Sequence, residues 1–457
     1  MSNELASKTI FELAPLLKNK KISPVELTKD ILNNINNKQN NVYVDVYKEQ
    51  AISESKKKEK EIMNNNYKGP LHGIPMGVKN NIYIQNRRAT MGSKIHHDFK
   101  PNHNASVIER LIKKGVIIIG SQNMHEYAWG GTTENPFYGT CRNPWDSSRT
   151  PGGSSGGSAI AVSENMTIFS LGTETLGSLR IPASFCGVVS IKPTYGQVSN
   201  FGVFPLAWSL DTVGPISKNV YDASLILENI IGFDKNDLNT IKSIKQRYTK
   251  HITDNVEGVV IGIEEDFFFH NVDKRITEIV KRHISKLEKK GAKIKNIKMH
   301  TLKDSLYAST IISMSESSTI HNENLLSRPN DFGDDVRAQL YSGKIPSAVE
   351  YLQAQQLRST ISTEFSQKFK DVDVLIAPTI PFIPFFIGDT TTILNGKKIE
   401  ITEHLSRLLR PSTLAGIPAI NIPCGFINNL PVGIQVMGDL FQEGKILNVA
   451  RSIETQI

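Results

Sequence analysis

Residues 151–187 constrain the fold of this chain more than any other stretch, and they read PGGSSGGSAIAVSENMTIFSLGTETLGSLRIPASFCG. The first part is built of glycine and serine, as a flexible linker would be, but linkers contain few apolar residues. Here the glycines run directly into SAIAV, TIFSL and IPASFCG, whose residue types are usually buried. We therefore expect a tightly packed interior segment, in which glycines let neighbouring backbone approach closely.

Two familiar glycine-rich motifs do not fit this stretch. A phosphate-binding loop ends in a glycine followed by lysine, and no lysine occurs between positions 151 and 191. The segment GGSSG (152–156) matches the GxSxG turn of serine hydrolases, but that turn follows an apolar strand. The preceding RNPWDSSRTP is polar and broken by prolines, and no downstream histidine lies in a glycine-rich or aspartate-partnered context, so this interpretation is disfavoured.

Composition excludes several classes of function. Of the 457 residues 39% are hydrophobic and 21% charged, which is typical of a globular protein. The net charge of +8 comes from scattered lysines without a nucleic-acid motif, so we expect no direct nucleic-acid binding. Three separated cysteines (Cys141, Cys186 and Cys424) predict neither disulfides nor a metal site. No signal peptide or apolar span of about 18 residues is found, which favours a cytoplasmic protein without membrane contact.

The order of the predicted elements indicates an α/β fold. Capping boxes at TIFE (9–12) and SPVE (23–26) predict two or three helices up to about residue 67. Beyond them short apolar strands alternate with helical segments, as in GIPMGVK, NASVIERLIKKG and GVIIIG, and the pattern continues to LPVGIQVMG near the carboxyl end. We expect one domain over 1–457, with a helical layer (1–67), a core (68–240) and a C-terminal part (241–457).

Several of these segments together resemble the amidase signature family, over nearly the whole chain. The landmarks are GIPMGVKNN, GGSSGGSAIAV, GTETLGSLRIPASFCG, GVFPLAWSLDTVGPI and LAGIPAINIPCGF, in the family's order. The resemblance implies a large mixed β-sheet sandwiched between helices. It also implies a catalytic triad of Lys79, Ser154 and Ser178, in which the peptide bond before Ser154 is cis. Ser178 would be the nucleophile that forms an acyl-enzyme.

Amide hydrolysis explains why these residue types are needed. A lysine acts as a base only when it is neutral, and burial lowers its pKa; no acidic residue lies between positions 69 and 89 to oppose this around Lys79. Ser154 would relay the proton, because a hydroxyl both donates and accepts. By resemblance, the backbone N–H groups of Thr175, Leu176, Gly177 and Ser178 form the oxyanion hole, and Ala128 contributes a backbone carbonyl to the substrate channel.

Three further residues have expected places in the core or in the pocket. Arg180 is expected to be structural and paired with a carboxylate. Trp129 and Trp208 are candidates for the lining of the acyl pocket, although aromatic residues near glycine turns often belong to the core.

The sequence departs from the family pattern at three positions. GTETLGS stands where GTDTGGS is common, so Glu174 replaces an aspartate and Leu176 a glycine; Asn80 replaces an acid. A leucine at 176 restricts the backbone, especially if its φ angle is positive, and its side chain would crowd the substrate. Loss of one oxyanion donor costs about a hundred- to a thousandfold in rate.

Three hypotheses follow. The leading one is a stand-alone amidase that cleaves a small amide without a cofactor. Such an enzyme could be a homodimer. The second is the glutaminase (A) subunit of a tRNA-dependent amidotransferase. Partner subunits are expected only under this second hypothesis. The third is a catalytically weakened or non-catalytic protein on the same scaffold, because of Glu174 and Leu176. The sequence does not identify the amide, since the acyl pocket would be built from variable segments at about 300–410.

Overall fold

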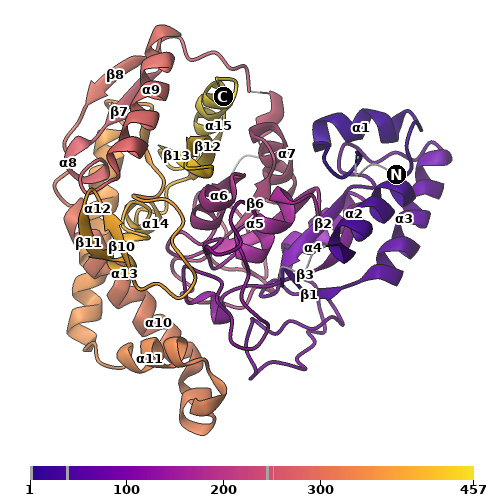
Figure 1. The fold of residues 1–457 in the computed structure, drawn as a ribbon, viewed down its shortest axis with the longest axis horizontal. Coiled ribbons are helices and arrows are strands. Elements are labelled where there is room, and N and C mark those ends of the chain that lie inside the picture. The colour runs from indigo at the N-terminus through magenta and orange to yellow at the C-terminus, as the bar shows by residue number, and fades with distance from the viewer. Residues whose placement is uncertain (1–3, 38–40, 243–245, 251, 457) are drawn as a thin grey trace.

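A single mixed sheet of 11 strands organises the protein in the computed structural model, which describes residues 4–37, 41–242, 246–250 and 252–456. The strands lie in the order β1-β3-β2-β4-β6-β5-β12-β13-β9-β7-β8, and β10 pairs with β11 in a separate hairpin. Helices flank the sheet (Figure 1), so the expected α/β fold class is confirmed. Among the described residues, no helix is both long and apolar enough to cross a membrane.

The strands are β1 (Tyr43–Val46), β2 (Pro75–Lys79), β3 (Ile117–Gln122), β4 (Phe169–Glu174), β5 (Val189–Lys192), β6 (Thr212–Ser217), β7 (Val260–Ile263), β8 (Lys293–Asn296), β9 (Val374–Pro378), β10 (Thr391–Leu394), β11 (Lys397–Glu400), β12 (Ala419–Ile427) and β13 (Leu430–Gly438). The α-helices are α1 (Ile10–Lys18), α2 (Pro24–Asn36), α3 (Lys48–Met63), α4 (Ser106–Lys113), α5 (Gly156–Ser163), α6 (Arg180–Cys186), α7 (Val220–Ile230), α8 (Glu265–Phe268), α9 (Lys274–Lys289), α10 (Ser305–Ser327), α11 (Asp334–Ser342), α12 (Ala348–Lys368), α13 (Ile401–His404), α14 (Arg410–Leu414) and α15 (Glu443–Glu454).

The N-terminal helices form as their capping residues predict. Thr9 with Glu12 and Ser23 with Glu26 make complete capping boxes at the starts of α1 and α2. These helices and α3 gather at one end of the molecule (Figure 1). The short strand β1 was not expected between them; it pairs antiparallel with β3 at the edge of the sheet. The division of 1–457 into three parts stays a prediction.

The strands β3, β2 and β4 run parallel, and their arrangement creates the place for a site. Lys79 is the last residue of β2, and Glu174 is the last residue of β4. Because the carboxyl ends of neighbouring parallel strands meet at one edge, the segments that follow these residues come together. The glycine-serine stretch supplies α5 before β4 and α6 after it.

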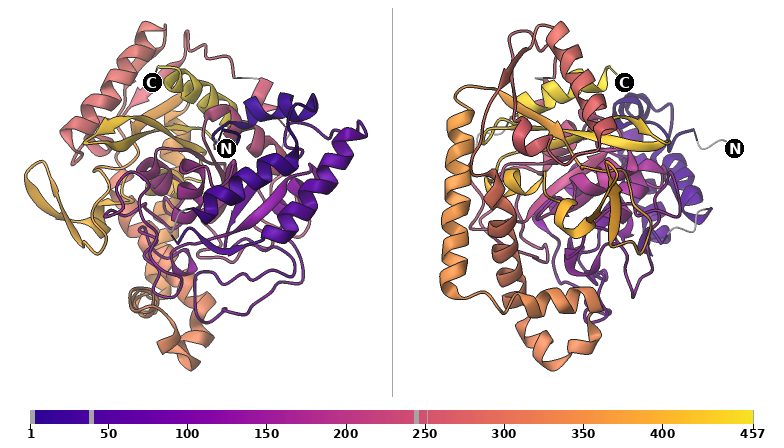
Figure 2. Two further views of the ribbon diagram at one scale, coloured as in Figure 1. Left: turned by 45° about the vertical axis from the view of Figure 1, so that its right-hand side comes forward. Right: turned by 60° about the vertical axis from the view of Figure 1, so that its left-hand side comes forward.

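The C-terminal half contributes a hairpin and two long helices. β12 and β13 are joined by Asn428 and Asn429, whose φ angles of 52° and 63° are those of a tight two-residue hairpin turn. The helices α10 and α12 lie side by side, joined through α11 (Figure 2). These helices occupy the segment at 300–410 in which the sequence predicts the variable pocket wall.

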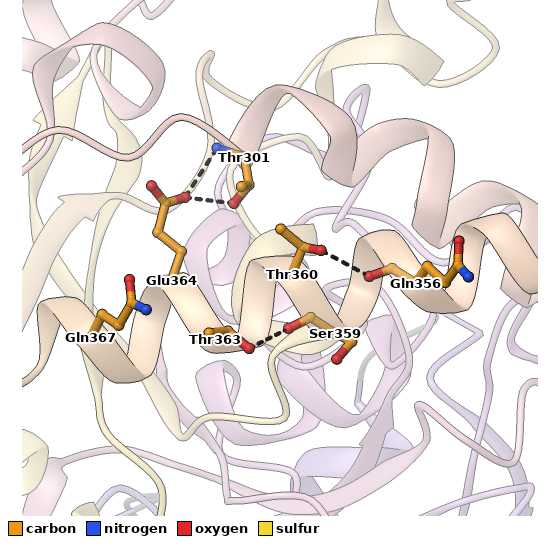
Figure 3. A pocket seen from close by; sticks show the side chains of 7 residues that line it. All are labelled: Thr301, Gln356, Ser359, Thr360, Thr363, Glu364 and Gln367. Carbon is orange, nitrogen blue, oxygen red and sulfur yellow. Dashed lines mark hydrogen bonds between the residues drawn. The ribbon is translucent and has the colours of Figure 1, made fainter.

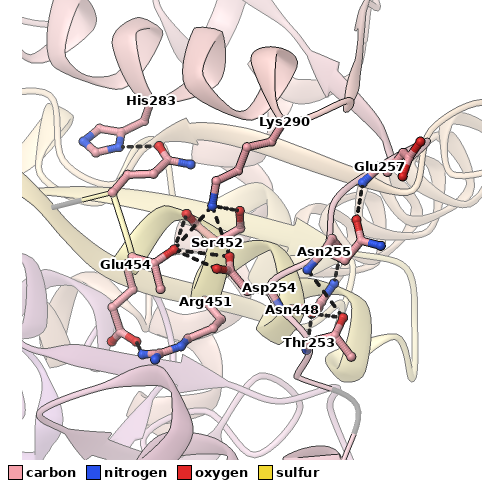
Figure 4. Close-up of polar contacts among 12 residues, drawn as sticks. Thr253, Asp254, Asn255, Glu257, His283, Lys290, Asn448, Arg451, Ser452 and Glu454 are labelled. Carbon is pink, nitrogen blue, oxygen red and sulfur yellow. Dashed lines mark hydrogen bonds and ion pairs between the residues drawn. The ribbon is translucent and has the colours of Figure 1, made fainter.

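Polar contacts fasten α15 to the end of α9 and to the segment before β7 (Figure 4). The ammonium of Lys290 donates to Asp254 at 3.3 Å and to Ser452 at 3.2 Å. The side chain of Asn448 accepts the backbone N–H of Thr253 at 2.8 Å. These contacts lie among the helices of the C-terminal part and include none of the expected site residues.

Candidate active site

Lys79 is fully buried and its amine meets two hydroxyl groups. The Nζ atom lies 2.7 Å from Ser154 Oγ and 2.8 Å from Thr173 Oγ1, and 3.4 Å from the carbonyl oxygen of Thr173. Burial lowers the pKa of Lys79 to about 7, while the negative charges of Asp211 and Glu174 oppose the shift. When the amine is neutral, its two N–H bonds suit the two Thr173 oxygens, and its lone pair is left for the Ser154 hydroxyl.

Ser154 lies in the turn that leads into α5, and the Gly153–Ser154 peptide bond is cis. Its side chain is fully buried. A Cβ atom at Gly153 would come within 2.8 Å of the backbone nitrogen of Thr132 and 3.0 Å of the carbonyl oxygen of Gly130. The preceding residue is therefore restricted to glycine by the close approach of another backbone segment.

Ser178 stands at the end of the turn between β4 and α6. It is 8% exposed, and that exposed surface faces a cavity. Its carbonyl oxygen accepts the N–H of Ser155 at 3.3 Å, which ties it to the Ser154 segment. The structure thus brings Lys79 and Ser154 into contact and holds Ser178 beside them through the backbone. Within the described residues no hydrogen bond joins the two serine hydroxyls.

The turn at 175–178 presents backbone donors without acceptors. In the described part of the chain, the N–H groups of Thr175, Leu176, Gly177 and Ser178 make no hydrogen bond. The left-handed conformation in this turn belongs to Gly177, whose φ is 122°, and not to Leu176. The concern that a leucine at 176 has to adopt a positive φ is therefore resolved, and its N–H remains a candidate oxyanion donor.

Glu174 and Arg180 form the structural ion pair that the sequence predicts for Arg180. Both side chains are fully buried, and Arg180 Nε donates to Glu174 Oε1 at 3.0 Å. The other carboxylate oxygen accepts the N–H groups of Leu179 and Arg180 at 3.2 and 3.3 Å. Glutamate at 174 therefore reaches the first turn of α6 and satisfies its backbone, so the extra methylene is accommodated.

Asp211 is a site residue that sequence reasoning missed. It is buried just before β6 and accepts hydrogen bonds from the Thr175 hydroxyl and from the N–H groups of Leu206 and Ala207. Burial raises its pKa to about 7, although these donors act against the shift. Thr173, which holds the Lys79 amine, was missed as well. Both lie inside quoted landmarks, SLDTVGPI and GTETLGS, and this was the one signal that could have found them.

A cavity of about 360 Å³ opens in front of Ser178. Of the expected residues, Ala128, Leu176, Ser178 and Trp129 line it, whereas Thr175 and Gly177 contribute no lining side chain. Trp208 is 43% exposed and lies elsewhere, so its expected place in the pocket is wrong. The opposite wall comes from the C-terminal part and consists of Thr310, Ser313, Met314, Ile401, Leu405, Ser406 and Arg410, among others.

A second hollow runs along α12 and has a different character (Figure 3). Some of its polar side chains are held by bonds to one another or to nearby backbone: Glu364 accepts from the backbone and hydroxyl of Thr301, and Thr363 donates to the carbonyl of Ser359. It contains none of the predicted site residues. Nor does the described part of the chain hold a group of three or more histidine, cysteine or acidic side chains placed to bind a metal ion.

Comparisons with known proteins find relatives along nearly the whole chain. A family model described as Amidase matches residues 26–447. The A subunit of the glutamyl-tRNA(Gln) amidotransferase of Thermoanaerobacter pseudethanolicus is 36% identical, over 99% of this chain and 96% of its own length. A crystal structure of an amidase has a TM-score of 0.90 at 30% identity, covering 98% of this chain and 100% of its own. The A subunit of the corresponding amidotransferase from Thermotoga maritima has a TM-score of 0.83 at 33% identity, covering 100% and 96%.

Proposed function

The chain belongs to the amidase family, and from this membership we propose that it hydrolyses a carboxamide with Ser178 as nucleophile, Ser154 as proton relay and Lys79 as base. One observation carries the assignment: a buried lysine amine lies 2.7 Å from a buried serine hydroxyl. In the described residues no carboxylate bonds to this amine, and burial lowers its pKa to about 7. A neutral amine in that position removes a proton, which is what a serine nucleophile requires.

The reaction proceeds in two halves. The Ser178 oxygen attacks the amide carbon, and its proton passes through Ser154 to Lys79. The oxyanion receives hydrogen bonds from the free N–H groups of 175–178. The C–N bond then breaks, the amine leaves with the proton from Lys79, and an acyl-serine ester remains. Water attacks this ester by the same route and releases the carboxylic acid.

The relative from Thermoanaerobacter pseudethanolicus supports one particular role for this chemistry. That protein is named as the A subunit of a glutamyl-tRNA(Gln) amidotransferase, and it aligns with 99% of this chain. We therefore place the glutaminase (A) subunit of a tRNA-dependent amidotransferase ahead of the stand-alone amidase that the sequence favours. In this role the ammonia released from glutamine passes to partner subunits.

The stand-alone amidase remains the second candidate, supported by fold similarity. The solved amidase has the TM-score of 0.90, against 0.83 for the Thermotoga maritima protein. The third hypothesis is a protein whose catalysis is weakened by Glu174 and Leu176. The argument that these residues distort the backbone no longer holds, since Glu174 pairs with Arg180 and the positive φ belongs to Gly177. What remains of that hypothesis is the side chain of Leu176 in the cavity.

A serine-reactive fluorophosphonate tests the triad without knowledge of the substrate. We expect an adduct on Ser178, found by mass spectrometry, that disappears in Ser178→Ala and Lys79→Ala. Ser163→Ala is the matched control. That serine is the last residue of α5, and among the described residues its hydroxyl donates only to the carbonyl of Cys186, the last residue of α6. An adduct on another serine would contradict the assignment.

Ammonia release then separates the two roles. Glutamine turnover that requires copurifying partner subunits would support the amidotransferase role. Turnover of small amides by the isolated chain, at a rate unaffected by such partners, would support the stand-alone enzyme. Ammonia is measured for a panel of amides with and without the partners, and Ser178→Ala gives the background.

A further inference from the structure

Asp211 is a buried carboxylate that joins two segments beside the cavity. One of its oxygens accepts the hydroxyl of Thr175, the first residue of the turn at 175–178. The other oxygen accepts the backbone N–H groups of Leu206 at 2.8 Å and of Ala207 at 3.0 Å. Leu206 lines the cavity. The carboxylate therefore ties the turn that carries the free backbone donors to a loop that forms part of the cavity wall.

The sheet determines that Thr175 and Asp211 meet. β4 and β6 pair antiparallel, and the last pair of their ladder joins Glu174 with Thr212. Thr175 and Asp211 are the next residues along the two segments, so their side chains bond where the backbone ladder stops. This bond anchors Thr175 through its side chain. Its backbone N–H, which has no acceptor among the described residues, stays available to an oxyanion.

The charge of Asp211 also acts on the base of the proposed triad. Burial lowers the pKa of Lys79 to about 7, and the negative charges of Asp211 and then Glu174 oppose this shift. Glu174 is paired with Arg180, whereas Asp211 makes no ion pair in the part of the chain that the structure describes. Of the two carboxylates that act on Lys79, Asp211 is thus the one whose charge no cation balances.

We propose that Asp211 is a positioning residue of the hydrolysis, whose carboxylate anchors the turn at 175–178 through Thr175 and whose charge acts on the amine of Lys79. This inference rests on the proposed hydrolysis and adds a residue to it. A carboxylate suits the role of anchor, because hydrogen bonds to a charged acceptor are stronger than those to a neutral one. Two substitutions separate the anchor from the charge.

Asp211→Asn removes the charge and keeps the shape. The amide oxygen can accept the two backbone N–H groups, and the amide NH₂ can donate to the Thr175 hydroxyl, so the turn stays anchored. Without the negative charge the protonated amine of Lys79 is less favoured, and the pH midpoint of the reaction should move to lower pH. Glu316 and Tyr195, the other titratable groups that interact with Asp211, are unchanged in this variant.

Thr175→Val removes the anchor and keeps the carboxylate. Valine has nearly the shape of threonine but lacks the hydroxyl, so the turn loses its bond to Asp211. We expect kcat at the alkaline plateau to fall by about tenfold to a hundredfold, because displaced oxyanion donors lose part of what a missing donor costs. KM should stay close to its wild-type value, since the donors act in the transition state.

Asp222→Asn is the matched control. Asp222 is a buried carboxylate in α7, and burial raises its pKa to about 7, as it does for Asp211. Its oxygens accept the backbone N–H groups of Ile10 at 2.8 Å and of Phe11 at 3.2 Å, and none of these residues lines the cavity. We expect this variant to keep the wild-type midpoint and kcat, although it also loses a buried charge.

Two measurements give these quantities. The rate at which the fluorophosphonate labels Ser178, followed across pH, gives the midpoint without a substrate. Glutamine turnover, with the copurifying subunits present where it requires them, gives kcat and KM. The midpoint within one variant does not depend on the amount of folded protein, and circular dichroism checks the folding of each variant before the values of kcat are compared.

A midpoint at lower pH in Asp211→Asn, together with a lower kcat in Thr175→Val, supports the proposal. An unmoved midpoint in Asp211→Asn, the same shift in Asp222→Asn, or a wild-type kcat in Thr175→Val would overturn it. The proposed hydrolysis fails separately, if the fluorophosphonate leaves Ser178 of the wild type unlabelled and no amide is turned over.

Discussion

The two walls of the cavity solve the problem of buried polar groups in opposite ways. On the wall formed by the ends of β2 and β4, Glu174 pairs with Arg180, and Lys79 shares hydrogen bonds with Ser154 and Thr173. On the wall formed by α10 and α14, Arg410 meets only hydroxyls. The first wall is complete without a ligand and suits chemistry common to many amides. On the second wall Nη2 of Arg410 has no acceptor among the described residues, so we expect differences in substrate selectivity to arise there.

The largest effect is expected on the first wall, from Lys79→Met. Without the amine no group deprotonates Ser178, so kcat should fall by about 10⁴-fold or more. In the wild type kcat/KM should rise with pH through about 7, because the neutral form of Lys79 is the base and its pKa lies there. This rise should be absent from whatever activity the variant retains. Ammonia release across neutral pH measures both effects.

Lys192 offers a matched control for this experiment. It is equally buried, and burial lowers its pKa to about 7 as well, but its Nζ donates to the carbonyl of Pro193 at 3.0 Å. Lys192→Met should therefore keep the pH midpoint of the wild type. If the pH midpoint moved in Lys192→Met, or remained in Lys79→Met, the pH dependence of kcat/KM would not report the titration of Lys79, and the prediction would be wrong.

The second effect concerns stability and compares the two arginines. Arg180→Met leaves the carboxylate of Glu174 buried without its partner, which should lower the free energy of unfolding by about 3–5 kcal/mol. Arg410→Met leaves only hydroxyls behind, and we expect a loss of about 1 kcal/mol or less. Urea denaturation followed by circular dichroism measures both. Equal losses would mean that Arg410 and its hydroxyl partners form a structural network as important for stability as the Glu174–Arg180 pair.

The residues of the first wall could be proposed from the sequence because the patterns that indicate them are local. Capping boxes, apolar strands and the glycine-serine stretch are each read within a short segment, and Lys79, Ser154 and Ser178 follow from landmarks in the family's order. The pairing of Arg180 with a carboxylate was expected too, although Glu174 was not named as the partner. Thr173 and Asp211 were not predicted, because each acts by contacting a residue of another segment.

The second wall could not be predicted, because its members come from segments a hundred positions apart. Ser309 and Thr310 lie in α10, whereas Arg410 begins α14 and Ser406 precedes that helix. No periodic pattern connects a serine in one helix with an arginine in another. Trp208 was placed wrongly for a related reason, since an aromatic residue near a landmark carries no indication of the direction in which it points.

Leu176 lies between the two walls and gives the smallest expected effect. Its backbone belongs to the oxyanion turn, while its side chain lines the cavity and packs against the core. Leu176→Gly keeps the N–H donor and adds space, so longer acyl groups should be accepted better. For short amides kcat/KM should change by less than about tenfold, as expected for a change in apolar contact.

Kinetics over a series of amides of increasing chain length decide what Leu176 does. A gain that grows with chain length and appears in KM would make this side chain a limit on substrate size. A uniform gain in kcat of about a hundredfold or more would instead mean that leucine disturbs the oxyanion turn itself. If Leu176→Gly gave no gain on any amide, Leu176 would determine neither substrate size nor the rate. Selectivity would then depend on the wall formed by α10 and α14.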